Sequence, residues 1–227
     1  NQKVVEETPA TKLPDKVRNK LHKFAVKLGN YINYSNAGTV EFLVSGQGNI
    51  YFLEMNTRLQ VEHGVTEMVT GLDLVEMQIR VANGEVIRLS QDEIYIRGHA
   101  IEARVYPEDP DTFIPDVGII TGLHIPKGRL SRIDTALCKG YEVTLHYEPL
   151  LAKVMAWGKN RDEAIRRLQK VLLGIRLNGI KSNISLLQTL LSDSSFNCST
   201  HHTGTVSEII EDQKLNKCQP KLSGRME

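Results

Sequence analysis

The chain has 227 residues, of which 41% are hydrophobic, and its formal net charge is +1 at pH 7. This composition is that of a globular protein with one or two cores, and its charge balance gives no indication of nucleic acid or a membrane surface as a partner. No apolar run approaches the roughly 20 residues of a membrane helix, and no signal-peptide pattern opens the sequence. Because the first residue is Asn1, we expect a piece of a longer polypeptide.

The cysteines favour a reducing compartment. Cys138, Cys198 and Cys218 are odd in number and far apart, which fits free thiols better than a disulfide framework. Their spacing also excludes a convincing zinc site. His201 and His202 are adjacent on a polar loop, and such pairs are usually incidental rather than metal ligands.

The first predicted elements lead up to a hairpin. The run of residues 4–7 could finish a strand. Apolar residues recur at helical spacing between Val17 and Tyr31 and follow Pro14, which suits a first turn, so we expect a core-packing helix. Residues 35–38 end this helix.

Two β-rich runs on either side of a glycine-containing loop at residues 45–48 predict a β-hairpin. With that loop, Val44 pairs with Asn49, and Glu41 lies opposite Phe52. A loop one residue longer or shorter would turn Glu41 to the opposite face unless a bulge compensates.

In this register the hairpin brings two acids together. Glu54 is the diagonal neighbour of Glu41 on the same face, at roughly 7 to 8 Å between the backbones. Two carboxylates at that separation can bind one divalent cation, and Asn56 on the same side can supply a neutral oxygen. Paired acids on a hairpin are often merely solvated, so the pattern alone leaves a metal site and a solvated face equally open.

The second run of the hairpin continues as a row of polar residues. If the chain stays extended to His63, one face carries Glu54, Asn56, Arg58, Gln60 and Glu62, and the other face, which includes His63, is largely apolar. An edge strand with a solvated face is the ordinary interpretation of such alternation. The row contains no lysine and has Asn and Gln, which have low strand preference, and this argues for a functional face.

A further strand is predicted within residues 94–106. His99 falls on its apolar face and is interpreted as a packed core histidine. Glu102 and Arg104 share the mostly polar face, and the pattern alone favours a structural Glu-Arg pair.

The rest of the sequence predicts an antiparallel sheet with helices. Short alternating runs predict strands at residues 118–125, 130–134, 140–143 and 150–157. Lys153 lies among apolar residues in the last run and needs a partner if it is buried. Capping pairs and apolar stripes predict helices near residues 74–82, 160–175 and 184–191. From Asp212 the sequence turns polar, which indicates a flexible tail or linker over residues 212–227.

Several motifs together resemble one family. The run Glu-Met-Asn-Thr-Arg-Leu-Gln-Val-Glu-His, preceded by Gly-Thr-Val-Glu-Phe-Leu and followed by Val-Thr-Glu-Met-Val-Thr-Gly-Leu-Asp-Leu-Val, is similar to the biotin carboxylase component of biotin-dependent carboxylases, in the ATP-grasp superfamily. The similarity extends from Gln2 to Glu211 and covers the C-terminal half of that component. It implies an α+β fold with the C-terminal part of an ATP-grasp domain at residues 1–88. A biotin carboxylase C-terminal domain with an antiparallel sheet and helices would follow at residues 89–211.

The resemblance assigns the metal ligands. It implies that Glu41, Glu54 and Asn56 hold Mg²⁺ or Mn²⁺, which bridges the phosphates of ATP. Gly64 stands where the resemblance leads us to expect proline, and we expect this glycine to loosen the chain that follows Glu62.

The resemblance also assigns the bicarbonate and biotin residues. Arg58, Gln60 and the backbone of Val61 would bind bicarbonate, and Glu62 would be the general base. Arg104 ends the segment Arg-Gly-His-Ala-Ile-Glu-Ala-Arg, whose final arginine would face biotin and stabilise its enolate.

The implied activity is that of a ligase. Such an enzyme uses ATP and bicarbonate, through carboxyphosphate, to carboxylate biotin on a carrier protein within an acyl-CoA or pyruvate carboxylase. The implied partners are the N-terminal half of the biotin carboxylase, the biotin carboxyl carrier domain and the carboxyltransferase component, and a homodimer contact near residues 127–132 is possible. The compartment could be the cytosol or the mitochondrial matrix. The lid and lysines that contact ATP would lie before Asn1, so we expect this chain alone to be inactive.

Two alternatives stay open. Another ATP-grasp ligase, such as a carbamoyl phosphate synthetase module, shares the acidic metal pattern. It is not expected to combine Arg58, Gln60 and Glu62 with Arg104. An alternative from a different class is a non-catalytic assembly or dimerisation module in which the polar row is merely inherited.

Overall fold

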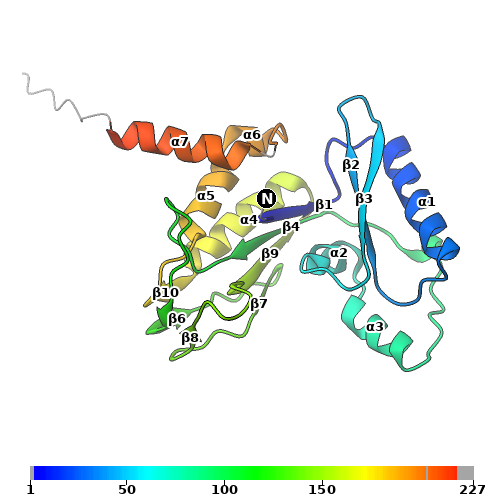
Figure 1. Ribbon diagram of the computed structural model, residues 1–227, viewed down its shortest axis with the longest axis horizontal. Helices are drawn as coiled ribbons and strands as arrows, with labels where there is room; N and C mark the ends of the chain where they lie inside the picture. Colours follow the sequence, from blue (N-terminus) through cyan, green and yellow to red (C-terminus); the bar gives the residue numbers. More distant parts are fainter. Residues whose placement is uncertain (1–2, 203, 219–227) are drawn as a thin grey trace, which may run out of the picture. The chain divides into compact units, whose positions relative to one another are not determined.

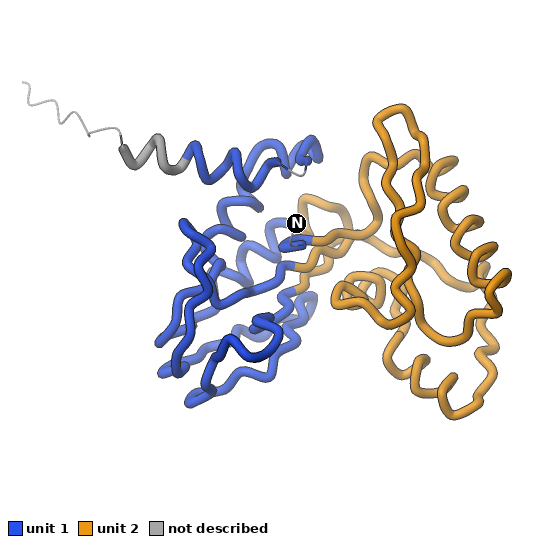
Figure 2. Tube along the Cα trace, in the orientation of Figure 1, with its two compact units in different colours: residues 1–5, 103–154, 165–227 blue, residues 6–102, 155–164 orange. Residues whose placement is uncertain are grey.

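The structure is a computed structural model that describes residues 3–202 and 204–218. The chain forms two compact units (Figure 2). Unit 1 contains residues 1–5, 103–154 and 165–227, and unit 2 contains residues 6–102 and 155–164. This division differs from the predicted domains, because residues 89–102 and 155–164 belong to the same unit as residues 6–88. The predicted domain boundaries stay a prediction.

Unit 2 is built on a hairpin and helices (Figure 1). Its elements are α1 (Asp15–Tyr31), β2 (Thr39–Val44), β3 (Ile50–Asn56), α2 (His63–Thr70), α3 (Leu74–Ala82) and the short 3₁₀ helix η1 (Gln91–Glu93). The N-terminus predicted for α3 is confirmed, because the carboxylate of Asp73 accepts a hydrogen bond of 2.8 Å from the backbone N–H of Glu76.

The β2–β3 register corrects the predicted pairing. The loop is one residue longer than expected, so Val44 pairs with Ile50 rather than Asn49, and Phe42 pairs with Phe52. The register then shifts next to Phe42, where Leu53 is the extra residue of a bulge in β3. Beyond it Glu41 lies directly opposite Glu54, and Thr39 lies opposite Asn56. The bulge restores the shared face that the longer loop would have destroyed.

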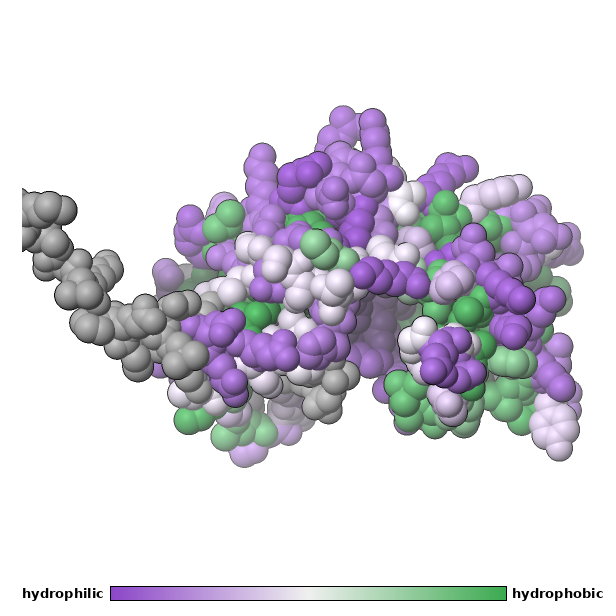
Figure 3. Space-filling view, turned by 90° about the horizontal axis from the view of Figure 1, so that it is seen from above, coloured by the Kyte–Doolittle hydropathy of each residue, from purple (hydrophilic) through white to green (hydrophobic). Residues whose placement is uncertain are grey.

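Helix α1 has the predicted bounds but not the predicted burial, because none of its residues is buried. Its apolar side packs on a hairpin of two strands, which is too small to cover it. A groove of about 310 Å³ stays open between them, lined by Phe24, Leu28, Phe42, Ile50 and Phe52. Apolar side chains are therefore exposed on this part of unit 2, as Figure 3 shows.

Strands β1 (Val5–Thr8), β4 (His99–Val105) and β9 (Ala152–Gly158) each carry the chain across the boundary between the units. With β7 (Ser131–Thr135) they form a four-stranded sheet in the order β1-β4-β9-β7. Every residue of β4 is buried. The face that carries Glu102 and Arg104 is therefore buried as fully as the face that carries His99, so it is not a solvated polar face.

Unit 1 contains short strands and most of the later helices (Figure 1). They are β5 (Gly118–Ile119), β6 (Gly122–His124), β8 (Glu142–Val143), β10 (Arg176–Asn178), α5 (Ile184–Ser192), α6 (Ser194–Asn197), α7 (Thr205–Cys218) and α4 (Arg161–Gly174), which starts in unit 2. The predicted single strand at residues 118–125 is two strands, because β5 pairs with β8 and β6 pairs with β10, both antiparallel. Leu168, Leu172, Leu187 and Leu191 are fully buried in the core.

Lys153 has the partner that its burial requires. Its side chain is 11% exposed, and its Nζ lies 3.5 Å from the Oδ2 atom of Asp134. Arg132 donates to the other oxygen of the same carboxylate at 2.7 Å. Partial burial raises the pKa of Asp134, but the two cationic neighbours hold it below its ordinary value.

The predicted tail begins inside a helix, because α7 runs from Thr205 to Cys218. Residues 212–218 are free of proline and glycine and rich in good helix formers, so the helix continues through this polar stretch. The rest of the predicted tail, residues 219–227, lies outside the described residues. Among the helices that the structure describes, none is long and apolar enough to cross a membrane. The thiols of Cys138 and Cys198 are free and exposed.

Candidate functional site

The predicted row of five polar residues does not lie along one strand. Strand β3 ends at Asn56, residues 57–62 form a turn, and α2 begins at His63. The extended prediction is wrong from Thr57 onward. The physical reason is that Thr39, the first residue of β2, pairs with Asn56, so no further residue of β2 pairs with the chain beyond that point.

The turn nevertheless brings the predicted metal ligands and Gln60 together. The amide Nδ2 of Asn56 donates to Oε1 of Glu41 at 3.2 Å and to Oε1 of Glu54 at 3.1 Å. The amide Nε2 of Gln60 donates to the same Oε1 of Glu41 at 2.5 Å. Two carboxylates from neighbouring strands therefore converge on one atom.

Arg58 borders this cluster. Its guanidinium donates to Oδ1 of Asn56 at 3.3 Å and to the backbone carbonyl of Leu59 at 3.1 Å. The side chain is exposed. A planar, exposed guanidinium beside a pair of amides can bind a small oxyanion through parallel hydrogen bonds.

The cluster fits a hard divalent cation after one rearrangement. The NH₂ group of Asn56 now occupies the point that a cation would take between Glu41 and Glu54. Turning this amide end for end would present Oδ1 to the same point and give three oxygen ligands. Within the described residues there is no group of three or more His, Cys, Asp or Glu that could hold a metal. The donor set is therefore small, and it suits a cation that shares its coordination with phosphate or water.

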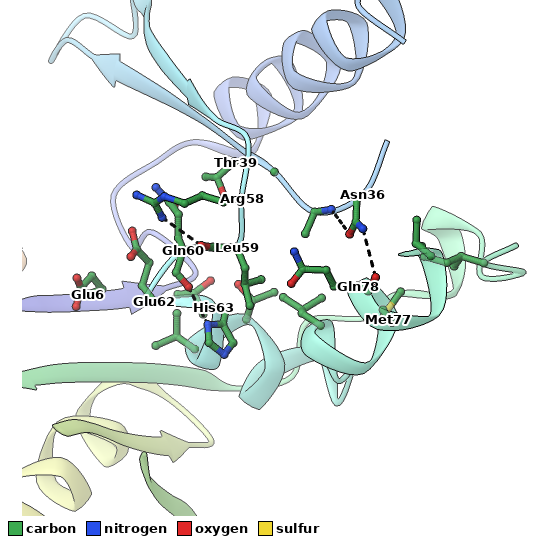
Figure 4. A pocket seen from close by; sticks show the side chains of 18 of the residues that line it. Glu6, Asn36, Thr39, Arg58, Leu59, Gln60, Glu62, His63, Met77 and Gln78 are labelled. Atoms are coloured by element: carbon green, nitrogen blue, oxygen red, sulfur yellow. Dashed lines mark hydrogen bonds between the residues drawn. The ribbon is translucent and has the colours of Figure 1, made fainter. Parts of the chain in front are cut away.

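The turn also forms part of a cavity of about 690 Å³ in unit 2. Figure 4 shows the labelled side chains of Arg58, Gln60, Glu62 and His63, which all line this cavity. Glu62 is the residue before α2, and its carboxylate does not cap the helix. The opposite part of the lining is more apolar and comes from α3, with Leu74, Met77 and Val81.

His63 is a residue that the sequence reasoning assigned to the apolar face. Its Nδ1 atom lies 2.7 Å from the backbone carbonyl oxygen of Gln60, and its ring lines the cavity. The sequence signal that could have placed His63 at the cavity is its position directly after Glu62 in the polar row. Strand alternation assigned it to the opposite face because the chain is not extended there.

Gly64 does not loosen the chain after Glu62. It is the second residue of α2 and is buried. A Cβ atom at this position would overlap the sulfur of Met155, so the glycine allows close packing of α2. This packing holds the end of the turn that carries Glu62.

A mostly buried ionic group lies beside the same cavity. Glu7, which lines the cavity, accepts hydrogen bonds at one oxygen, Oε2, from Nε2 of His99 at 2.9 Å and from Nε of Arg161 at 2.7 Å. Burial raises the pKa of Glu7, but these two bonds and their charges lower it below its ordinary value. The prediction of His99 as a buried histidine is confirmed, although its partner is a carboxylate rather than an apolar core.

Arg104 lies in unit 1, on β4, and is 9% exposed. Its backbone N–H donates to the carbonyl of Val4 at 3.0 Å. Its carbonyl accepts a hydrogen bond of 3.1 Å from Nδ2 of Asn183, and Oδ1 of the same asparagine accepts from the N–H of Tyr106 at 2.9 Å. Asn183 is fully buried, and its amide pairs with β4 as a neighbouring strand would.

Asn183 directly precedes α5, which agrees with the helix that the sequence predicts near residues 184–191, but its side chain makes no cap hydrogen bond there. The polar residue types were the correct signal for a helix start. Nothing local in the sequence indicates that the side chain pairs with β4.

His201 and His202 form no metal centre in the part of the chain that the structure describes. The ring of His201 packs on Phe196, with centroids 5.2 Å apart. His202 lies 3.5 Å from the carboxylate of Glu208.

Comparisons with known proteins cover nearly the whole chain. The family described as carbamoyl-phosphate synthase L chain, ATP binding domain, matches residues 1–90, and the biotin carboxylase C-terminal domain matches residues 102–208. The chain is 46% identical over 211 residues to a biotin carboxylase from Halalkalibacterium halodurans, covering 93% of this chain and 47% of that protein. It is 44% identical over 214 residues to the mitochondrial methylcrotonoyl-CoA carboxylase subunit alpha of Rattus norvegicus, covering 93% of this chain and 30% of that protein.

Solved structures give the same result. The fold is similar to the biotin carboxylase domain dimer of the Hydrogenobacter thermophilus 2-oxoglutarate carboxylase, which was solved with MgADP, ADP and bicarbonate. The TM-score is 0.90 at 40% identity, and the match covers 92% of this chain and 47% of that one. The chain therefore spans less than half the length of these three relatives.

Proposed function

We propose that this chain, which belongs to the biotin carboxylase family and corresponds to the C-terminal half of that component, supplies the residues that face the cation, bicarbonate and biotin in a biotin carboxylase active site. The observation that carries the proposal is the convergence of Glu41, Glu54, Asn56 and Gln60 beside Arg58. These side chains have the chemistry that a phosphate-bound cation and a small oxyanion require.

In this proposal Glu41 and Glu54 would hold Mg²⁺ or Mn²⁺ near the phosphates of ATP, and Asn56 would add a third oxygen once its amide has turned. When bound, the cation neutralises charge on the phosphates. Three protein oxygens would leave further coordination positions for phosphate and water, which suits Mg²⁺.

Bicarbonate is bound by the turn between β3 and α2. Arg58 pairs with the anion, and the amide of Gln60 and the backbone of Val61 add hydrogen bonds. Glu62 removes the bicarbonate proton as general base. Its position fits this role, because its carboxylate lines the cavity instead of capping α2.

Carboxylation of biotin follows. The deprotonated bicarbonate attacks the γ-phosphate of ATP to give carboxyphosphate and ADP. Carboxyphosphate then breaks down to CO₂ and inorganic phosphate. The CO₂ forms a bond to the ureido nitrogen of biotin, and the released phosphate accepts the proton that this nitrogen loses. Arg104 stabilises the negative charge that develops on the biotin oxygen as its enolate forms. The acceptor is biotin on a carrier domain, and a carboxyltransferase component uses the product within an acyl-CoA or pyruvate carboxylase.

The remaining parts of the proposal concern partners. A preceding segment, of the size that the relatives carry, would provide the lid and lysines for ATP, and a homodimer is a further element of the proposal. The proposed compartment is the cytosol or the mitochondrial matrix, and the relative from Rattus norvegicus is mitochondrial by name.

The test is ADP release by the full polypeptide that contains this chain, with Mg-ATP and bicarbonate, in the presence and absence of free biotin. We expect biotin to stimulate ADP release and Glu62→Gln to abolish the stimulation, while Glu85→Gln, at an exposed acid of unit 2, leaves it unchanged. The 227-residue chain without a preceding segment is expected to release no ADP.

The alternatives give different results. ATP hydrolysis that biotin does not affect would favour another ATP-grasp ligase. A carbamoyl phosphate synthetase module is the specific alternative, because residues 1–90 match the ATP-binding domain of the carbamoyl-phosphate synthase L chain. A folded polypeptide that hydrolyses no ATP would favour an assembly or dimerisation module.

A further inference from the structure

His63 makes a contact that the proposed roles do not use. Its Nδ1 atom lies 2.7 Å from the backbone oxygen of Gln60. A carbonyl oxygen only accepts hydrogen bonds, so Nδ1 must carry the proton. This donor exists in the neutral Nδ1–H tautomer and in the imidazolium ion, so the bond does not require a particular charge on His63.

The same carbonyl accepts a second hydrogen bond. The backbone N–H of His63, at the first position of α2, donates to the oxygen of Gln60 at 3.3 Å. Such an N–H has no acceptor within its own helix. The imidazole and the helix terminus therefore both anchor the main chain of Gln60.

The anchored residue is the one that reaches back to the hairpin. The side chain of Gln60 donates to Glu41 at 2.5 Å, across 19 positions of sequence. A continuous chain of hydrogen bonds thus runs from His63 through Gln60 to Glu41. The turn that it fixes also carries Val61 and Glu62.

We propose that His63 is a positioning residue for bicarbonate, and that its Nδ1–H fixes the backbone of Gln60 so that the Gln60 amide and Glu62 point into the cavity. This inference rests on the proposed function. In it the imidazole acts through Gln60 and makes no contact with bicarbonate.

Two substitutions separate this role from a direct contact. The amide nitrogen of asparagine can take the place of Nδ1, whereas the amide nitrogen of glutamine takes the place of Nε2. His63→Asn is expected to keep the KM for bicarbonate within about twofold of the wild-type value. His63→Gln is expected to raise that KM by about three- to tenfold, the effect of losing one hydrogen bond, with a smaller change in kcat. His22→Gln, at an exposed histidine of α1, is the matched control and should change neither.

Specific outcomes of these two substitutions would overturn the proposal. An unchanged KM for bicarbonate in His63→Gln, together with a raised KM in His63→Asn, would mean that Nε2 itself contacts bicarbonate. If both variants raise the KM for bicarbonate equally, or if neither raises it, the Nδ1–H hydrogen bond does not position the bicarbonate residues. If the glutamine variant fails to fold, the asparagine variant and the spectrum described next decide the matter.

A spectroscopic measurement tests the bond without catalysis. In ¹⁵N-histidine NMR spectra of the full polypeptide above neutral pH, His63 should carry its proton on Nδ1 and not on Nε2. A proton on Nε2 would refute the positioning role. Failure of biotin to stimulate ADP release by the wild type would instead refute the proposed function and leave this spectral result standing, so the two failures are distinguishable.

Discussion

The residues proposed to bind the cation and bicarbonate are held in the opposite way to Arg104, the residue proposed to act on biotin. In unit 2, Glu41, Glu54 and Gln60 are partly or fully exposed and are joined by bonds between side chains. In unit 1, Arg104 lies on a fully buried strand whose main chain is paired by Asn183. The first arrangement can rearrange around a ligand at low cost, whereas the second is fixed by the core. The following substitutions should therefore change stability in decreasing order.

The largest loss is expected from Asn183→Ala. It removes the side-chain hydrogen bonds to Arg104 in β4 and to Tyr106 just after it, and leaves these buried backbone groups without that partner. We expect the free energy of unfolding to fall by about 2 to 4 kcal/mol. Urea denaturation of the full polypeptide measures the loss, and hydrogen exchange at the Tyr106 amide locates it. Asn178→Ala, at an exposed asparagine of β10, should change stability by less than about 0.5 kcal/mol. Equal effects of the two substitutions would contradict the description of Arg104 as held in place by the Asn183 side chain.

A somewhat smaller loss is expected from Gly64→Ala, which sharpens the comparison inside unit 2. The added methyl group would overlap the sulfur of Met155, which is fully buried, and overpacking of this kind costs about 1 to 3 kcal/mol. In a Met155→Ala background the same substitution should cost much less, because the conflicting atom is gone. A double-mutant cycle of unfolding free energies checks this. Additive effects would mean that another contact restricts position 64.

Acid should reveal a moderate contribution from Glu7. Burial raises its pKa, but the bonds from His99 and Arg161 lower it below the ordinary value of 4.5. A lowered folded-state pKa adds stability that is fully present above the unfolded value and is lost as the pH falls through the folded value. Glu7→Gln should lower stability at pH 7 and flatten its decline below pH 4.5. The urea midpoint as a function of pH measures this, and a parallel shift at all pH values would contradict it. Glu85→Gln is the control.

The smallest change in stability is expected from Glu54→Gln, because Glu54 is exposed on the hairpin. Its unfolding free energy should stay within about 0.5 kcal/mol of the wild type. The affinity for Mn²⁺, followed by electron paramagnetic resonance with ATP present, should fall by at least about tenfold, since one of two charged ligands is lost. A large loss of stability with unchanged Mn²⁺ affinity would mean that Glu54 is held by packing, as Arg104 is, and is not a metal ligand.

Local patterns in the sequence predicted much of this protein. The hairpin, the bounds of α1 and α3, and the capped starts of the helices near residues 74–82 and 160–175 follow from residue types a few positions apart. The resemblance carried by the ten residues from Glu54 to His63 led to the family that the comparisons identify. Sequence reasoning also stated the condition under which Glu41 and Glu54 could share a face, namely a bulge that compensates for a longer loop.

The tertiary structure decided what depends on residues far apart in the chain. Nothing near Leu53 indicates that it forms the bulge, because the register depends on the partner strand. The turn after Asn56 replaces the extended row because β2 offers no further pairing, and this moves His63 to the cavity. Asn183 pairs with a strand 79 positions away, and Gly64 packs on Met155. Hydrophobic period and capping are local properties, whereas register, side-chain partners and close packing are set only when distant segments meet.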